Sequence, residues 1–289
     1  MLIQAFAKIN WSLDITGLRE DGYHLMDMLM QPVSLADEIF LEPSGTIGLT
    51  TGGYPPCRAD RTNLAWRAAE ALKEASGYPG GVSIHVHKSI PIGAGMGGGS
   101  SDAAGVLFGL NKLWNTGFSA DELERIGLTL GADVPFALRG GLSRTRGIGE
   151  ILENYENRYN YWLVVIQPCG GLSTAKVFSL WKNESSPVRP DTDAALSALQ
   201  TGDFPKLCES IGNVLQPVAC RLRPEIEDAC GALLREGASA ARMTGSGSAV
   251  FGVFRNASAA EKAYKALSAA ERNIFLCHTQ HDSIRIKEE

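Results

Sequence analysis

The chain has 289 residues, of which 44% are hydrophobic and 20% charged, and its formal net charge is −5. A chain of this length can bury a sizeable core and is expected to form two domains. Because it is mildly acidic and has no long run of Lys and Arg, we expect neither a nucleic acid nor a membrane surface as its partner.

The predicted elements of the first half mix strands and helices. From residue 9 to residue 15 every second residue is apolar, which is the period of a half-buried strand. The elements expected after it are a polar turn at 17–22, short strands at 39–41 and 47–49, a helix at 62–75 and a strand at 82–87. This last strand leads into a glycine-rich stretch.

The glycine-rich stretch, residues 91–104, reads PIGAGMGGGSSDAA. Its five glycines leave backbone N–H groups free to converge on an anion at close range. Ser100 and Ser101 are expected to cap the following helix, whose N-terminus attracts negative charge. A tight strand-to-helix turn would need only one or two glycines, so we favour a run of phosphates as the ligand. The residues predicted to bind it are Pro91, Gly93, Gly95, Gly97, Gly98, Gly99, Ser100 and Ser101.

Two familiar phosphate loops do not fit these glycines. Residues 93–98 match the dinucleotide pattern G-x-G-x-x-G, but residues 89–91 separate the strand from the first glycine. Residues 112–114 (Lys-Leu-Trp) offer no acid for a ribose. The chain also has no G-x-x-x-x-G-K-[ST] pattern. The sequence therefore predicts a phosphate loop of another kind, without a lysine of its own.

The second half is predicted to be α+β. A helix with capping-box spacing begins at Ser119 and Glu122 and is stopped by Gly131. Residues 147–160 are polar and irregular, so we place the domains at 1–152 and 153–289, with the last strand free to return to the first domain. The later elements are strands at 161–166, 249–254 and 274–278, a loop at 183–192, helices at 193–201, 203–215 and 224–236, and a helix before the last strand capped by residues 258–261.

Cysteine usage and the N-terminus bear on the compartment. The six cysteines are scattered, with no Cys-x-x-Cys pair, so no metal or redox site is assigned and free thiols are expected. That fits a reducing compartment. The first eight residues lack the pattern of a secretory signal, and the apolar run 162–166 is too short to span a bilayer. We therefore predict a cytoplasmic protein.

Three further stretches carry candidate chemistry, and each has a structural alternative. Lys8 lies between apolar residues at the start of the first strand, so it either points inward or is a surface lysine. Asp133 follows a helix stop and precedes a proline, so its carboxylate is either an N-cap or a working group. Gly245 and Gly247 lie in a small-residue loop that a hairpin or a bulge explains as well as a ligand does.

Together these stretches resemble the motifs of the GHMP kinase superfamily, which includes galactokinase, homoserine kinase and mevalonate kinase. The glycine loop resembles its second motif, and residues 243–249 resemble its third. More specifically, AKIN at 7–10, DGYH at 21–24, GGGSS at 97–101 and GADVP at 131–135 resemble kinases of a cytidine-diphosphate-linked methylerythritol. The match spans residues 5–255 and is weakest at 153–240. The fold implied is α+β, with an N-terminal domain like a ribosomal protein, a ferredoxin-like C-terminal domain and both substrates in the cleft between them.

The resemblance also implies an activity and the residues that carry it. The γ-phosphate of ATP, with Mg²⁺ bridging its β- and γ-oxygens, would move to the tertiary 2-hydroxyl of the methylerythritol moiety, a step of the non-mevalonate isoprenoid pathway. Asp133 would take the hydroxyl proton with Lys8 beside it. The other implied contacts are Asn63 for the nucleotide, Tyr23, His24 and Phe178 for the cytidine, and Asn10 and Thr174 for the acceptor. The partners are small molecules, and we expect a monomer or a homodimer.

Three alternatives stay open. Another small-molecule kinase of the superfamily is disfavoured by DGYH at 21–24. A nucleotide-binding regulator without catalysis is disfavoured by the presence of Lys8 and Asp133. A dinucleotide oxidoreductase would bind NAD(P), which a fluorescence titration tests.

Overall fold

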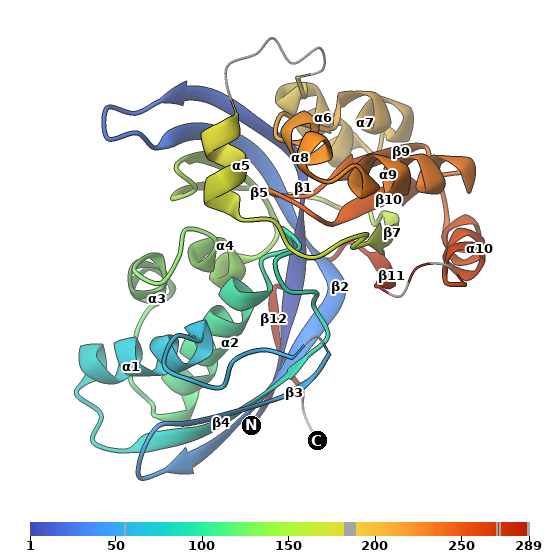
Figure 1. Ribbon diagram of the computed structural model, residues 1–289. Helices are drawn as coiled ribbons and strands as arrows, with labels where there is room; N and C mark the ends of the chain where they lie inside the picture. Colours follow the sequence, from blue (N-terminus) through green and yellow to red (C-terminus); the bar gives the residue numbers. More distant parts are fainter. Residues whose placement is uncertain (55, 182–188, 270, 272, 288–289) are drawn as a thin grey trace.

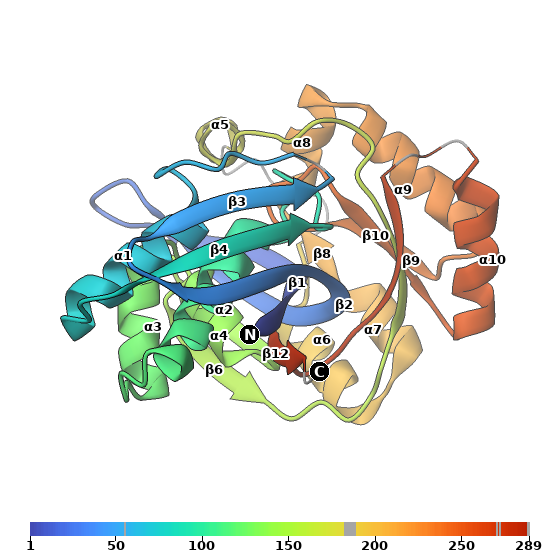
Figure 2. The same ribbon diagram turned by 90° about the horizontal axis from the view of Figure 1, so that it is seen from below.

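Two β-sheets organise the molecule (Figure 1). The structure is a computed structural model that describes residues 1–54, 56–181, 189–269, 271 and 273–287. The strands of the larger sheet are β1 (Leu2–Leu18), β2 (His24–Ser44), β3 (Gly48–Gly53), β4 (Gly81–Lys88), β5 (Leu142–Gly147), β6 (Ile151–Tyr155), β8 (Gly212–Asn213) and β12 (Ile284–Lys287). Their central order is β12-β1-β2-β4-β3, and Figure 2 shows these long strands side by side as one twisted layer. The last strand, β12, thus pairs with the first.

The smaller sheet is antiparallel throughout. It contains β7 (Trp162–Ile166), β9 (Ala240–Met243), β10 (Val250–Phe254) and β11 (Ile274–His278), in the order β11-β7-β10-β9. Counted along the chain this is the order fourth, first, third, second, with helices before the second strand and before the fourth. That is the β-α-β-β-α-β arrangement of a ferredoxin-like unit, as predicted.

The helices divide between the two sheets. In the N-terminal half they are α1 (Leu64–Ser76), α2 (Gly98–Leu113), α3 (Ala120–Leu128) and α4 (Val134–Arg139), which lie together on one face of the larger sheet (Figure 1). In the C-terminal half they are α5 (Thr174–Leu180), α6 (Thr192–Thr201), α7 (Phe204–Ser210), α8 (Gln216–Leu222), α9 (Glu225–Arg235) and α10 (Ala257–Leu267). None of the helices in the described ranges is long and apolar enough to cross a membrane.

Strand β1 runs through both halves and contributes to three buried cores. Ile3 packs under α1 and α2, Trp11 packs on one face of the smaller sheet, and Ile15 belongs to the core on that sheet's other face. The strand predicted at 9–15 is confirmed, with Ile9, Trp11, Leu13 and Ile15 buried, but it is not half-buried, because Asn10 and Ser12 are buried as well. The middle of β1 therefore lies where the two sheets meet, and its polar residues lie there too.

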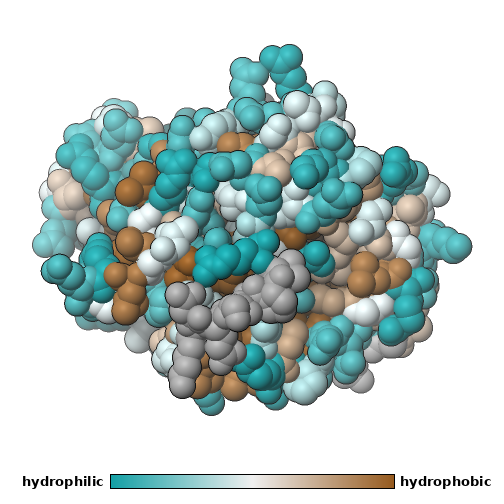
Figure 3. Space-filling model, turned by 90° about the horizontal axis from the view of Figure 1, so that it is seen from above, coloured by the Kyte–Doolittle hydropathy of each residue, from teal (hydrophilic) through white to brown (hydrophobic). Residues whose placement is uncertain are grey.

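The surface drawn in Figure 3 is mostly hydrophilic, with hydrophobic residues in small groups between the hydrophilic ones. Single exposed apolar side chains are normal in folded proteins. All six cysteines are free, as expected.

Several local predictions differ from the structure. The strands predicted at 39–41 and 47–49 are confirmed as strands but not in length, because 39–41 lies within the longer β2 and β3 runs from Gly48 to Gly53. The region 147–160 is irregular only in part: residues 156–160 form no helix or strand, but β6 pairs with β5 in a polar hairpin in which the Ser143 hydroxyl donates to Asn154 Oδ1 at 2.7 Å. The predicted division between residues 152 and 153 falls within β6 and remains a prediction.

The helix predicted at 203–215 ends early, and α10 has another cap. After Ser210 the chain turns into β8, where the Asn213 amide donates to the carbonyl oxygens of Met243 and Gly245 at 2.9 and 2.8 Å. These hydrogen bonds stabilise the chain after Ser210 more than further turns of helix would, because they satisfy buried carbonyl groups. Helix α10 is capped by Asn256, not by Ser258. The predicted loop at 183–192 lies in part outside the described residues, at 183–188.

Candidate active site

An irregularity in β1 joins this strand to the glycine loop. The register between β1 and β2 shifts between Phe6 and Lys8, and the Lys8 N–H donates to the carbonyl oxygen of Met96 at 3.0 Å. Such bulges often lie beside active sites, because they re-aim a side chain. Here the bulge brings Lys8 against the loop, although the two lie far apart in the sequence.

Lys8 points inward, so the alternative of a surface lysine is wrong. Its side chain is 7% exposed. The ammonium donates to Asn10 Oδ1 at 2.7 Å and to the Gly95 carbonyl oxygen at 3.1 Å, and its nitrogen lies 3.6 Å from Asp133 Oδ2. Charged groups are rarely buried without partners. These contacts fix the ammonium beside the carboxylate.

Asp133 occupies the N-cap position of α4 but does not cap it. Its backbone is helical (φ −83°, ψ −10°) and its carboxylate accepts no capping hydrogen bond from the helix. The side chain is 34% exposed, so the carboxylate is held by Lys8 on one side and remains open on the other. Of the two predicted alternatives, the N-cap is therefore wrong. The carboxylate is available to a ligand, and its catalytic role remains a prediction.

The glycine loop takes a left-handed backbone where it meets these groups. Gly97 has φ +73° and is the N-cap of α2, which begins at Gly98 without a side-chain cap. The predicted capping by Ser100 and Ser101 is therefore wrong, because the helix starts before both serines. Bare N–H groups at this helix end are consistent with an anion site.

Gly97→Ala is expected to lower kcat at least tenfold. A Cβ at Gly97 would lie 3.2 Å from Lys8 Cγ and 3.3 Å from Lys8 Cε, and the positive φ would add strain of about 1–3 kcal/mol. The lysine would move away from Asp133, and a displacement of about 1 Å can cost a large factor in rate. Turnover and thermal unfolding should be measured together, with Gly117→Ala as a control: Gly117 also has a positive φ, but open space surrounds its Cβ position. Equal turnover loss in both variants would contradict the prediction.

These groups line one cavity of about 640 Å³, a volume typical of small-molecule sites. Residues of the glycine loop and of the second small-residue loop both line it. The predicted site residues that line it are Lys8, Asn10, Asn63, Pro91, Gly93, Gly95, Gly97, Gly98, Gly99, Ser100, Asp133, Thr174 and Phe178. Ser101, Tyr23 and His24 are not among the described residues that line it. The roles of all these residues remain predictions.

Ser101 is buried behind the loop. Its hydroxyl is within hydrogen-bond distance of two carbonyl oxygens, those of Phe6 at 2.8 Å and Gly97 at 3.1 Å. It therefore ties α2 to β1.

The second small-residue loop packs directly on the glycine loop. A Cβ at Gly95 (φ +76°) would lie 2.2 Å from the Thr244 carbonyl oxygen, and one at Gly245 would lie 2.7 Å from the Gly95 carbonyl oxygen. Both positions therefore require glycine. Ser246 lies beside Thr174, with their hydroxyl oxygens 2.8 Å apart, and Gly245, Ser246 and Gly247 all line the cavity. The sequence left this loop open between a hairpin and a ligand contact, and in the structure it forms a cavity wall.

An aromatic cluster lies at the start of β2. The His24 ring lies 5.3 Å from the Phe178 ring and 5.6 Å from the Trp181 ring, centroid to centroid, with the second pair edge to face. Tyr23 is 58% exposed, and its ring lies 5.7 Å from the Arg19 guanidinium. The structure thus brings His24 and Phe178 together across 154 residues of sequence. Phe178 is shared between this cluster and the cavity wall.

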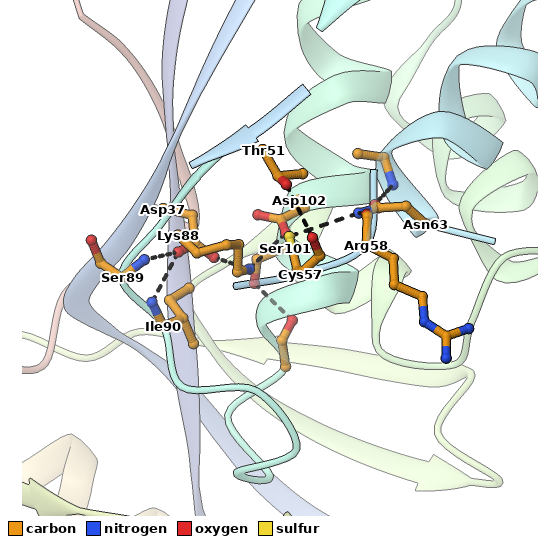
Figure 4. Close-up of polar contacts among 12 residues, drawn as sticks. Asp37, Thr51, Cys57, Arg58, Asn63, Lys88, Ser89, Ile90, Ser101 and Asp102 are labelled. Atoms are coloured by element: carbon orange, nitrogen blue, oxygen red, sulfur yellow. Dashed lines mark hydrogen bonds and ion pairs between the residues drawn. The ribbon is translucent and has the colours of Figure 1, made fainter. Parts of the chain in front are cut away.

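Sequence reasoning missed a buried ion-pair network in the cavity wall, shown in Figure 4. Lys88, at the end of β4, pairs with Asp37 of β2 and with Asp102 of α2, the latter at 2.7 Å. Lys88 and Asp102 line the cavity, as does Arg58. No local pattern marks these residues, because they come from separate elements. The one available signal was an Asp placed directly after the two serines of the loop.

Comparison with known proteins places the chain in a family. The model of the GHMP kinases N terminal domain matches residues 63–141, and that of the GHMP kinases C terminal matches residues 195–273. A 4-diphosphocytidyl-2-C-methyl-D-erythritol kinase of Alkaliphilus metalliredigens is 42% identical, covering 95% of this chain and 94% of the relative. One of Bacillus cereus is 39% identical, with 95% of each chain covered.

Solved structures agree with the sequence comparison. A crystal structure of 4-(cytidine 5′-diphospho)-2C-methyl-D-erythritol kinase has a TM-score of 0.83 and 38% identity, covering 96% of this chain and 99% of the other. A homoserine kinase of Cytophaga hutchinsonii shares the fold, with a TM-score of 0.76, 17% identity, and 99% and 97% covered.

The fold and the two matching domains define the chain as a GHMP kinase, as the motifs predicted. Within that superfamily it belongs to the family of the 4-diphosphocytidyl-2-C-methyl-D-erythritol kinases.

Proposed function

We propose that this chain transfers the γ-phosphate of ATP to the 2-hydroxyl of 4-diphosphocytidyl-2-C-methyl-D-erythritol. The observation that carries the proposal is the Lys8–Asp133 pair, which lies against the glycine loop in one cavity. The names of relatives about 40% identical over nearly the whole chain support the choice of acceptor. A cytoplasmic location and a monomer or homodimer are part of this proposal.

The chemistry asked of the protein is positioning and charge stabilisation. The bare N–H groups of the glycine loop and the N-terminus of α2 would hold the phosphates. Asp133, open on one side, would accept the proton of the acceptor hydroxyl. Lys8, held by Asn10 and Gly95, would keep the carboxylate in place and stabilise the charge that develops on the transferring group.

Magnesium is proposed as the companion of the nucleotide. Among the described residues no group of three or more His, Cys, Asp or Glu side chains is arranged to hold a metal. Mg²⁺ commonly keeps several waters and is bound through one or two carboxylates together with substrate phosphates. Bound with the nucleotide, it would neutralise phosphate charge, and no particular carboxylate of the chain is assigned to it.

The cytidine end of the substrate is proposed to meet the aromatic residues beside the cavity. Tyr23→Ala is expected to raise the KM for the cytidine substrate and to spare that for ATP, because base–aromatic stacking contributes about 1–3 kcal/mol. That corresponds to a rise of roughly 5- to 150-fold. Tyr159→Ala, at another exposed tyrosine, is the control in the same steady-state assay. A similar rise for both substrates would indicate a folding defect instead.

An acceptor panel tests the proposal as a whole. ATP turnover is measured with the cytidine-diphosphate methylerythritol, with methylerythritol phosphate and with homoserine. We expect turnover on the first alone. Turnover on homoserine would favour another kinase of the superfamily, and ATP binding without turnover on any acceptor would favour a regulator.

A further inference from the structure

The ion-pair network in the cavity wall contains two carboxylates and one ammonium. Lys88, Asp37 and Asp102 have side chains that are at most 5% exposed. Figure 4 shows Lys88 pointing between the two carboxylates, which come from different elements. With all three groups ionised, the network would hold one excess negative charge out of water, which is strongly disfavoured.

The network lies directly beneath the start of α2. A Cβ at Gly98, the first residue of that helix, would lie 3.4 Å from Lys88 Nζ. This is the place where the proposed phosphates meet the bare N–H groups. An excess negative charge buried here would repel a polyanion at short range through a medium of low polarity. Nucleotide binding therefore favours the form in which one of the two carboxylates is neutral.

The hydrogen bonds show which carboxylate can be neutral. Asp37 Oδ1 accepts the N–H groups of Ser89 and Ile90 at 2.6 and 2.9 Å, and its Oδ2 accepts from Lys88. These three donors favour the ionised form of Asp37, whose carboxylate also lies within hydrogen-bond reach of the Asp102 side chain. Asp102 Oδ2 accepts from Lys88, but its Oδ1 is buried with no hydrogen-bond partner.

We propose that Asp102 is protonated in the nucleotide complex, with the Asp37 carboxylate accepting its hydrogen bond, and that nucleotide binding is linked to uptake of this proton from solvent. Asp102 is thereby a positioning residue: it makes no bond with the nucleotide, and its neutral form lets the glycine loop accept the phosphates. The inference rests on the proposed binding of ATP in this cavity.

The surrounding charges agree with this assignment. Burial raises the pKa of Asp102 to about 8; the Lys88 ammonium acts against this, and the Asp37 carboxylate adds to it. Burial opposes the charge of Lys88, but Asp102 and Asp37 outweigh it and hold the Lys88 pKa above its ordinary value. The Cys57 thiol faces the network from the loop before α1, and burial raises its pKa too, so it is neutral near pH 7. From the β1 side, the cavity carries Lys8 with Asp133.

The sign of the linkage follows from the direction of these effects. A bound polyanion raises the pKa of Asp102 further, so the complex holds more protons than the free protein. The affinity for the nucleotide is then highest below about pH 7. It falls as the pH rises through the pKa of Asp102 in the free protein, about 8. The nucleotide Kd should rise up to about tenfold between pH 7 and pH 9.

Calorimetric titration with ADP tests the inference without turnover. At pH 8, titrations in Tris and in HEPES, whose ionisation enthalpies differ, count the protons taken up on binding. We expect the wild type to take up more protons on binding than Asp102→Asn, which is neutral at every pH and of the same shape. The ADP Kd of Asp102→Asn should stay flat between pH 7 and pH 9. Asp228→Asn, at an exposed position on α9, should behave as the wild type.

The outcomes are separable. Equal proton counts in the wild type and Asp102→Asn, or a wild-type Kd that does not change between pH 7 and pH 9, would overturn the linkage. Because the wild-type measurement needs no variant, a folding defect in Asp102→Asn would not leave the question open. Failure of ADP to bind at any pH would instead contradict the proposed nucleotide site.

Discussion

Asp133→Asn is expected to lower kcat by about 10²- to 10⁴-fold, the usual contribution of a general base. Asparagine keeps the shape of the side chain but cannot take the proton of the acceptor hydroxyl. ATP affinity should change little, because the phosphates are proposed to bind through backbone N–H groups of the glycine loop. Steady-state turnover measures the first effect, and a titration with a non-hydrolysable ATP analogue measures the second.

The control for Asp133→Asn is another aspartate at a helix N-cap. Asp203 caps α7, where its carboxylate accepts the Lys206 N–H at 3.0 Å. Asparagine caps helices about as well as aspartate, so Asp203→Asn should keep both stability and turnover. Turnover of Asp133→Asn close to that of the wild type would remove this carboxylate from the mechanism.

Features set by neighbouring residues were predictable from the sequence. The capping box is confirmed, with the Ser119 N–H donating to the Glu122 carboxylate and the Ser119 hydroxyl accepting from the Glu122 N–H. The strand around Trp11 is confirmed too, because its apolar residues i and i+2 share one buried face, although the burial of Asn10 and Ser12 on the other face was not predicted.

Features that depend on distant contacts were not predictable. Asp37 and Lys88 lie 51 residues apart in sequence, and only the pairing of β2 with β4 brings them together. The strand character of Gly212 and Asn213 comes from pairing with β1, which overrides a helical pattern. The Lys8 ammonium lies beside Asp133 because of both the bulge in β1 and the fold of the glycine loop, and neither can be read from the residues next to Lys8.

Lys8→Met is expected to lower kcat by about 10²- to 10³-fold, the range found when one charge-stabilising donor is removed from an active site. Methionine fills a similar volume but leaves Asn10 Oδ1 and the Gly95 carbonyl oxygen without the ammonium. Thr244 Oγ1 lies 3.3 Å from both oxygens and can replace part of this bonding. The loss in unfolding free energy should therefore stay near the lower end of about 1–3 kcal/mol, measured by thermal denaturation.

The double variant Lys8→Met/Asp133→Asn decides whether the two groups act as one unit. If the ammonium works by holding and complementing the carboxylate, removing both should cost about as much in kcat as removing the more important one alone. Groups that act independently would instead multiply their losses, to about 10⁴-fold or more. Lys8→Met combined with Asp203→Asn is the matched control, since Asp203 caps α7 and does not line the cavity. A multiplicative loss in the Lys8–Asp133 pair would mean that their 3.6 Å separation is structural and that Lys8 acts on the phosphates alone.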